Sequence, residues 1–343
     1  FGSSHLGCRF QALEAEQDRS VMGGTACRPC DSSCGCCNAD SDAAGIAGYK
    51  SSVEKLSSLP LEERVISAAA DQEAWPRGAG DTGSSPASYF ELDLEELRRS
   101  SLGGGAQLTH TFRSGAVYSG QCKDGQRHGM GSQSWPDGAS YIGAWQGNQA
   151  QGRGKFTFAD GSSYVGEWEG NRFHGLGAFH DVSKTVYHGQ WEHGRRSGLG
   201  AEQSGSSQGT RFAGNFRNGV KEGAGVCSWS DGGEYAGQWR WNQIKGCGVY
   251  ACSERRRRYV GHWHDSQKHG IGYYEWSDGR AYKGQYWEDQ ATGFGMFSWP
   301  DGQKYEGYWQ KGKQHGAGLY TGARGEKRQL LWREGRPMEP EGV

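Results

Sequence analysis

A short aromatic motif, Tyr-x-Gly-x-Trp, recurs about every 23 residues through the last two-thirds of this chain. The steps between successive motifs are 23, 23, 23, 25, 23, 24, 23 and 23 residues. A fixed period of this size indicates a stack of small structural repeats, which presents a long surface rather than one catalytic pocket. The leading aromatic residues of the nine units, here called repeats 1 to 9, are Tyr118, Tyr141, Tyr164, Tyr187, Phe212, Tyr235, Tyr259, Tyr282 and Tyr305.

Two alternating stretches within each repeat predict two β-strands. In repeat 3, Tyr164, Gly166 and Trp168 alternate with other residues, so the three share one face of a strand. A turn is predicted over 170–175, and glycine and aromatic residues then alternate again. Asp-Gly pairs close most repeats and are strong hairpin signals, because glycine accepts positive φ. We therefore expect each unit to be a β-hairpin whose rings lie over glycines of the neighbouring strand.

The chain divides into three parts. Residues 1–105 show no repeat and are rich in Ser, Ala and Gly, so we expect a largely flexible region there. Helices are predicted within it over 61–74 and over 88–100, and the second would dock as a cap on the start of the array. The array occupies 106–335, and a tail follows at 336–343. The predicted fold is all-β, an elongated antiparallel meander of about nine hairpins.

Composition excludes several classes of protein. The 38 basic and 39 acidic side chains give a net charge of −1, so no overall field draws the chain to nucleic acid, and no nucleic-acid partner is expected. No run of 18 apolar residues occurs, and the first twenty residues lack the apolar core of a secretory signal. A cytoplasmic location is therefore expected, and the ten cysteines are not interpreted as a disulfide framework.

The extended pattern Tyr-x-Gly-x-Trp…Gly-x-x-x-Gly-x-Gly…Asp-Gly-x-x-Tyr resembles the MORN (membrane occupation and recognition nexus) repeat. The resemblance covers about Tyr118 to Tyr320. Cys122, Phe216 and Tyr286 replace the tryptophan in three units. Repeat 4 ends in a serine- and glycine-rich stretch, residues 203–210, where we expect a weak or bulged hairpin.

The resemblance implies a non-enzymatic scaffold that associates with proteins and with membrane phospholipid, linking membrane and cytoskeletal structures. It also implies self-association, so a homodimer through the array is expected. Relatives include accessory regions of phosphatidylinositol phosphate kinases and lysine methyltransferases, which gives an alternative reading with the catalytic part outside this chain. Binding is expected on the aromatic face, at Tyr141, Trp145, Tyr164, Trp168, Tyr235, Trp239, Tyr259, Trp263, Trp276, Tyr282, Trp299, Tyr305 and Trp309.

No catalytic or metal-binding constellation stands out in the array. His128, His174, His269 and His315 each precede a glycine, and we interpret them as turn residues, because equivalent positions two units apart cannot converge on one ion. The recurring aspartates of the Asp-Gly pairs suit turns rather than acid–base pairs. We expect no enzyme activity, no catalytic residue, no metal and no cofactor. These aspartates are Asp137, Asp160, Asp231, Asp278 and Asp301.

Four consecutive arginines replace the Asp-Gly connection before repeat 7. They are Arg255, Arg256, Arg257 and Arg258. Such a tip is either a solvated loop or an anchor for anionic lipid head groups or an acidic partner, to which each basic residue contributes about 1 kcal/mol near a charged membrane.

A cysteine cluster near the start admits three interpretations: a redox-active or variable tail, lipidation, or zinc binding by an adaptor protein. The stretch from Met22 through Gly23 to Cys27 resembles an N-myristoylation start followed by palmitoylation cysteines, although Cys27 stands where Ser or Thr is preferred. If Met22 is the initiator, Gly23 becomes the modified terminus, and two acyl chains would anchor the protein stably. The cysteines concerned are Cys27, Cys30, Cys34, Cys36 and Cys37.

Overall fold

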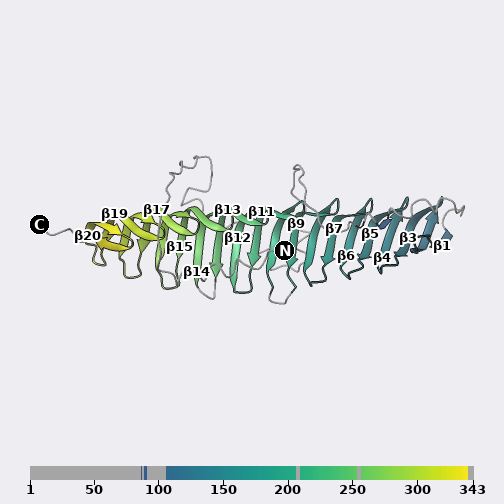
Figure 1. The fold of residues 1–343 in the computed structure, drawn as a ribbon, viewed down its shortest axis with the longest axis horizontal. Helices are drawn as coiled ribbons and strands as arrows, with labels where there is room; N and C mark the ends of the chain where they lie inside the picture. The colour runs from purple at the N-terminus through teal and green to yellow at the C-terminus, as the bar shows by residue number, and fades with distance from the viewer. Residues whose placement is uncertain (1–85, 87–88, 91–105, 206–208, 253–255, 339–343) are drawn as a thin grey trace. The chain divides into compact units, whose positions relative to one another are not determined.

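A computed structural model describes residues 86, 89–90, 106–205, 209–252 and 256–338. These residues contain 21 strands of antiparallel β-sheet, which confirms the predicted all-β meander (Figure 1). The described residues divide into two compact units, one that ends at Gly225 and one that begins at Val226.

The first unit contains the strands of repeats 1 to 4 and most of repeat 5. Each strand from β1 to β9 pairs antiparallel with the next one along the chain. The strands are β1 (Ala106–Thr111), β2 (Val117–Lys123), β3 (Gln126–Ser134), β4 (Ser140–Gln146), β5 (Gln149–Thr157), β6 (Ser163–Glu169), β7 (Arg172–His180), β8 (Val186–Glu192), β9 (Arg195–Gln203), β10 (Arg211–Arg217) and β11 (Val220–Ser228), which contains the boundary between the units.

The second unit continues the same pattern. Each strand from β12 to β20 again pairs antiparallel with its successor. The strands are β12 (Gly233–Arg240), β13 (Gln243–Cys252), β14 (Arg257–His264), β15 (Gln267–Glu275), β16 (Ala281–Trp287), β17 (Gln290–Ser298), β18 (Lys304–Gln310), β19 (Lys313–Thr321), β20 (Lys327–Arg333) and β21 (Arg336–Met338).

The first connection in each repeat is a two-residue turn. In repeat 3 it consists of Gly170 and Asn171, with φ of 54° and 65°. Two successive positive φ values match the right-handed twist of the flanking strands, which favours glycine and asparagine at these positions. The prediction of a turn over 170–175 was therefore too long, since β7 already begins at Arg172.

The second connection is the Asp-Gly turn. In repeat 1 the N–H of Gly138 donates to the carbonyl oxygen of Trp135 at 3.0 Å, and Gly138 has a φ of 95°. The Asp137 carboxylate accepts a hydrogen bond from the N–H of Ala139 at 3.0 Å. The same carboxylate-to-backbone bond recurs in repeats 2, 5, 7 and 8, which confirms that these aspartates serve the turn.

The leading aromatic residue of each repeat lies over a glycine, as expected. A Cβ atom built on Gly154 would lie 2.4 Å from the hydroxyl oxygen of Tyr141, so only glycine fits beneath this ring. The Tyr141 hydroxyl donates to the carbonyl oxygen of Ala144 at 2.9 Å. Because the side chain is fully buried, burial raises the pKa of Tyr141 well above its usual range. The phenol therefore stays protonated and acts as a core residue.

The tryptophan of the motif connects neighbouring repeats. The indole N–H of Trp145 donates to the carbonyl oxygen of Gly131 at 3.1 Å, and the equivalent bond recurs for Trp168, Trp191, Trp263 and Trp309. Where the motif lacks tryptophan, the replacement is also buried, so a smaller side chain still completes the core. The three replacements are Cys122, Phe216 and Tyr286.

In repeat 4, where a weak or bulged hairpin was expected, β8 and β9 pair with a register shift between Gly189 and Gln190, and residues 206–208 lie outside the described residues. β9 and β10 pair without a register shift, from Gln203 opposite Arg211 to Gly198 opposite Phe216. Glu202 stands at a position that is aromatic in most other repeats, and its carboxylate contacts both Arg196 and Lys221, the latter at 2.9 Å. Burial would raise the pKa of Glu202, but the two cations hold that pKa below its ordinary value.

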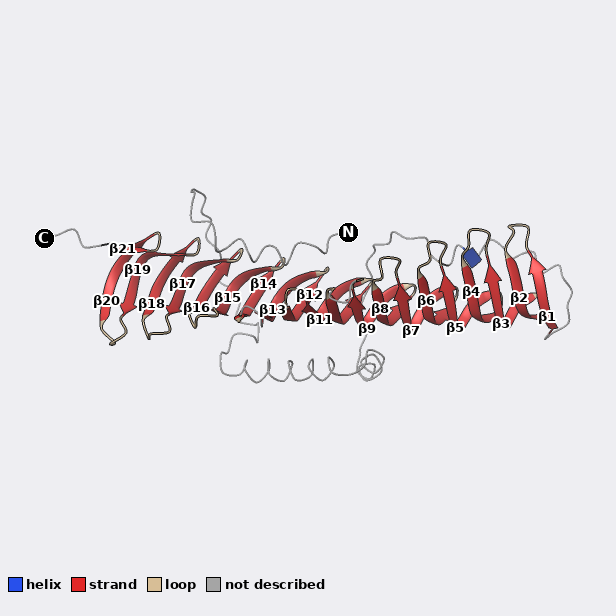
Figure 2. Cartoon of the chain, turned by 90° about the horizontal axis from the view of Figure 1, so that it is seen from below, coloured by secondary structure: helices blue, strands red, loops and turns tan. Residues whose placement is uncertain are grey.

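The predicted helix over 61–74 lies outside the described residues. Within the predicted helix over 88–100, the structure describes Tyr89 and Phe90, and both are helical (Figure 2). They pack against rings of repeats 1 to 3, near the start of the array where this helix was expected to dock.

Candidate functional site

Phe90 occupies an aromatic pocket on the sheet of the first unit. Its ring centroid lies 5.4 to 5.9 Å from those of five surrounding rings, all in edge-to-face geometry. Such pairs stabilise by about 0.5–1.5 kcal/mol each beyond the area that they bury. The side chain is completely buried, so the pocket encloses it. The five rings belong to Trp135, Tyr141, Trp145, Phe156 and Trp168.

The pocket also binds the backbone of the docked segment. The indole N–H of Trp135 donates to the carbonyl oxygen of Tyr89 at 3.1 Å. The guanidinium of Arg127, itself fully buried, donates to the carbonyl oxygen of Phe90 at 3.4 Å and lies 4.4 Å from the ring centroid of Trp145. Aromatic packing therefore selects the side chain, while two donors fix the main chain.

Tyr89 adds a polar contact at the rim of this pocket. Its hydroxyl donates to the Asp137 carboxylate at 2.8 Å, and this hydrogen bond raises the pKa of Tyr89. Its ring also lies 5.3 Å from that of Trp135 and 5.4 Å from that of Phe156. A dipeptide of two aromatic residues is thus held by ring contacts, two backbone carbonyl bonds and one carboxylate.

A neighbouring repeat shows why the pocket is open. The residue nine positions after the leading aromatic is Phe173 in repeat 3, and its ring lies 3.8 Å from that of Tyr164 and 5.3 Å from that of Trp191. Phe173 thus fills from its own strand the space that Phe90 fills in repeat 2. The equivalent residue of repeat 2 is Ala150, whose short side chain leaves that space for the docked segment.

Most of the aromatic residues proposed from the sequence as a binding face are buried in the sheet. Their rings and donors are used within the repeats, so they shape the groove without presenting a free surface. Trp276, Trp299 and Trp309 are the ones that stay half-buried. The buried ones are Tyr141, Trp145, Tyr164, Trp168, Tyr235, Trp239, Tyr259, Trp263, Tyr282 and Tyr305.

The arginine tip lies beside a cavity of about 330 Å³ in the second unit. Arg255 lies outside the described residues, whereas Arg256 and Arg258 are exposed and Arg257 is half-buried. The cavity is lined by these three arginines and also by Glu234 and Glu275. The two carboxylates offset part of the positive charge, which weakens the tip as a dedicated phosphate site.

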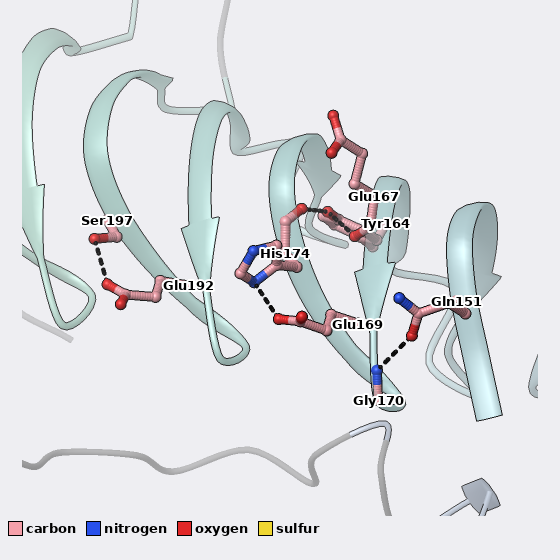
Figure 3. Close-up of polar contacts among 8 residues, drawn as sticks. All are labelled: Gln151, Tyr164, Glu167, Glu169, Gly170, His174, Glu192 and Ser197. Carbon is pink, nitrogen blue, oxygen red and sulfur yellow. Dashed lines mark hydrogen bonds and ion pairs between the residues drawn. The ribbon is translucent and has the colours of Figure 1, made fainter. Parts of the chain in front are cut away.

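The histidines are strand residues, which corrects their interpretation as turn residues. His174 lies in β7, where its Nδ1 is 3.2 Å from the Glu169 carboxylate and its carbonyl oxygen accepts a bond from the Tyr164 hydroxyl (Figure 3). His128, His269 and His315 lie in β3, β15 and β19. Across the described residues, no three His, Cys, Asp or Glu side chains gather in a way that could hold a metal ion.

The polar contacts near His174 lie within and between neighbouring hairpins. The N–H of Gly170 donates to the Gln151 side chain at 3.2 Å, and the Ser197 hydroxyl donates to Glu192 at 3.2 Å (Figure 3). These bonds join neighbouring strands and gather no nucleophile with a base. The proposed lipidation residues Gly23, Cys27, Cys30, Cys34, Cys36 and Cys37 all lie outside the described residues.

No helix in the described part of the chain is long and apolar enough to cross a membrane. The sequence predicted that the helix over 88–100 docks on the start of the array, but it did not identify Phe90 as the side chain that a pocket encloses. The available signal was a small residue, Ala150, at a position where every other repeat except repeat 8 carries a larger side chain. The alanine is found by counting from the leading aromatic, but its meaning depends on knowing which positions of neighbouring repeats meet in the structure.

Fold and site together define a tandem β-hairpin repeat protein with an aromatic groove that holds a peptide segment. The family model for the MORN repeat matches more than half of the chain, and the protein belongs to the MORN-repeat family. The nine matches cover residues 118–140, 141–163, 164–186, 187–207, 212–234, 235–254, 259–279, 282–304 and 305–327.

A search of the curated proteins found no match. Among solved structures, similarity was found to the SAS-4 (dCPAP) TCP domain of Drosophila melanogaster, solved with a proline-rich motif of Ana2, at 10% identity and a TM-score of 0.27. That match covers 62% of this chain and 97% of the other. The TCP10 domain of Danio rerio CPAP matches at 10% identity and a TM-score of 0.24, covering 68% and 98%. Scores this low carry no argument about fold or function.

Proposed function

We propose that this protein is a non-enzymatic scaffold that binds peptide segments of partner proteins in the aromatic groove of its MORN repeats. The observation that carries the proposal is the complete burial of Phe90 among five rings, with donors on both adjoining carbonyls. A groove that encloses one aromatic segment has the chemistry to recognise others of the same kind.

A binding measurement in trans tests this proposal. The probe is a fluorescein-labelled peptide of residues 84–97, and the protein is the full chain carrying Phe90→Ala, which empties the pocket without changing the sheet. We expect saturable binding by fluorescence anisotropy and at least ~100-fold weaker binding when the peptide itself carries Phe90→Ala, because burial of a phenylalanine contributes about 3 kcal/mol. Equal binding of the two peptides would refute the proposal.

Association with an anionic membrane is a second candidate, which would let the scaffold link membrane and cytoskeletal structures. Exposure of Arg256 and Arg258 at one hairpin tip supports it. We expect the chain to co-sediment with vesicles containing phosphatidylserine at low salt, and to lose most of this binding when the four arginines become glutamine. Vesicle binding that persists after the replacement would refute a role for the four arginines in membrane association.

Self-association of the array is supported by apolar side chains on the second unit. Ile271, Phe294 and Tyr308 are 55%, 56% and 57% exposed. We expect dimers in sedimentation equilibrium that weaken when Phe294 becomes Ser; a strict monomer at high concentration would contradict this expectation.

A cytoplasmic location and acylation at Gly23 and Cys27 remain predictions, to be tested by intact-mass measurement of the native N-terminus. The two alternatives also remain predictions. They are a zinc-binding adaptor through the cysteine cluster and an accessory region of a lipid kinase or lysine methyltransferase.

A further inference from the structure

The pocket around Phe90 is made from positions that recur in every repeat, so other repeats can carry the same set. Counted from the leading aromatics, the same five positions in repeats 7 to 9 are also all aromatic. They are Trp276, Tyr282, Tyr286, Phe297 and Trp309, which correspond in order to Trp135, Tyr141, Trp145, Phe156 and Trp168.

The two ring sets have closely matching geometry. The pair Trp276–Phe297 has centroids 5.5 Å apart at 52°, against 5.8 Å at 47° for Trp135–Phe156. Tyr282 lies 4.9 Å from Trp309, and the equivalent pair in the first unit lies 5.1 Å apart. Phe297 and Trp309 are 6.0 Å apart, against 6.1 Å. The second set therefore outlines a pocket of the same shape.

The position that decides whether such a pocket is open carries the same residue type, alanine, in both sets. Nine positions after the leading aromatic, repeat 8 has Ala291, as repeat 2 has Ala150. Repeat 3 has Phe173 there, which occupies the space itself, and repeats 6 and 9 have the larger side chains Ile244 and Gln314. Alanine occurs at this position in repeats 2 and 8 alone of the nine.

The rings of the second pocket are more exposed to solvent than those of the first pocket. Trp135, Phe156 and Trp168 are buried beneath Phe90, whereas their counterparts Trp276, Phe297 and Trp309 are all half-buried. Ala291 is half-buried too, although Ala150 is fully buried. Among the described residues, no acceptor faces the indole N–H of Trp276, whose counterpart in the first unit binds a peptide carbonyl.

The charged groups around the second pocket indicate the ligand. Lys268 replaces Arg127 as the buried cation and lies 5.6 Å from the ring centroid of Tyr286. At the rim, Asp278 replaces Asp137 but is bound by the side chain of Arg280 at 2.7 Å, and the Arg280 guanidinium lies 5.8 Å from the Trp276 ring. A ligand side chain at this rim would therefore meet the Arg280 guanidinium, whereas in the first unit Tyr89 meets the Asp137 carboxylate.

We infer that repeats 7 to 9 form a second peptide-docking site, for a partner segment in which an acidic residue directly precedes phenylalanine or tyrosine. The aromatic side chain fills the space above Ala291, and the indole N–H of Trp276 donates to the main-chain carbonyl of the acidic residue. The acidic side chain pairs with Arg280. This inference rests on the proposed function, since it extends the same recognition to a second place.

The test uses the full chain with Phe90 intact, so that the first pocket stays filled. The probe is a labelled peptide of residues 84–97 carrying Tyr89→Asp, which places aspartate before phenylalanine. Ala291→Phe should weaken its binding at least ~10-fold by filling the pocket as Phe173 does, and the matched control Ala150→Phe should leave it unchanged. Arg280→Gln should weaken binding by up to about fivefold, since the ion pair is solvent-exposed.

Binding unaffected by Ala291→Phe would overturn the inference, as would equal binding of a probe that also carries Phe90→Ala. Self-association without peptide that Ala291→Phe abolishes would also overturn it, because the occupant would then be a second copy of this chain. If the first-pocket peptide binds Phe90→Ala protein while this probe fails, the proposed function stands and the second site falls.

Discussion

Replacement of Gly154 by alanine tests whether the leading tyrosines are core residues packed on glycine. A Cβ atom at this position would lie 2.4 Å from the Tyr141 hydroxyl and 2.6 Å from its ring, about 1 Å inside normal contact. Overpacking of this kind costs about 1–3 kcal/mol, and losing the Tyr141 hydrogen bond adds about 1 kcal/mol. We therefore expect Gly154→Ala to destabilise the hairpin by about 2–4 kcal/mol.

The measurement is a double-mutant cycle with Tyr141→Ala, read by hydrogen exchange of β4 and β5 amides, since repeat arrays can open locally. Without the ring, Gly154→Ala should be neutral or stabilising by up to about 1 kcal/mol, because it restricts the unfolded chain. Gly143→Ala is the control, since its Cβ would lie 2.5 Å from the Cα of Gly154 and stays obstructed without the ring. Additive effects of Gly154→Ala and Tyr141→Ala would refute the reasoning.

Three further predictions concern the first unit. Phe90→Ala in the intact chain should uncover Trp135 and shift tryptophan emission to the red, whereas Phe294→Ala, at a side chain already 56% exposed, should not. Ala150→Phe should expel the docked segment, so Phe90→Ala should have no further effect on emission in that background. Glu202→Gln should destabilise β8 to β10 by about 2 kcal/mol, measured by hydrogen exchange. Because the pKa of Glu202 is lowered from 4.5, its contribution should be present above pH 4.5 and lost as the pH falls through the folded-state pKa; a pH-independent effect would contradict this.

The hairpin repeats could be predicted from the sequence because each depends on local spacing. Alternation of Tyr164, Gly166 and Trp168 sets the strand face, and Asp-Gly pairs set the turns, so neighbouring residues suffice to specify both. The length of the first turn could not be predicted as well from the sequence. The two positive φ values at Gly170 and Asn171 complete the turn in two residues, whereas the glycine pattern indicated a longer one.

Burial of the aromatic face was decided by the tertiary structure. From the sequence, Tyr141 and Trp145 were expected to meet a partner, but their rings pack on glycine and on one another, and their polar atoms bond to backbone carbonyls. A periodic pattern cannot distinguish a ring that lies against its own sheet from one that awaits a ligand, because both occupy the same strand face.

The sequence by itself determined the repeat, its two strands and the residue types at each position. The tertiary structure decided which positions of different repeats meet, and hence that Ala150 leaves a space which Phe90, from outside the repeats, fills. The physical reason is that strand periodicity is a property of adjacent residues, whereas a pocket is made by side chains from three repeats whose distances depend on how the strands pair.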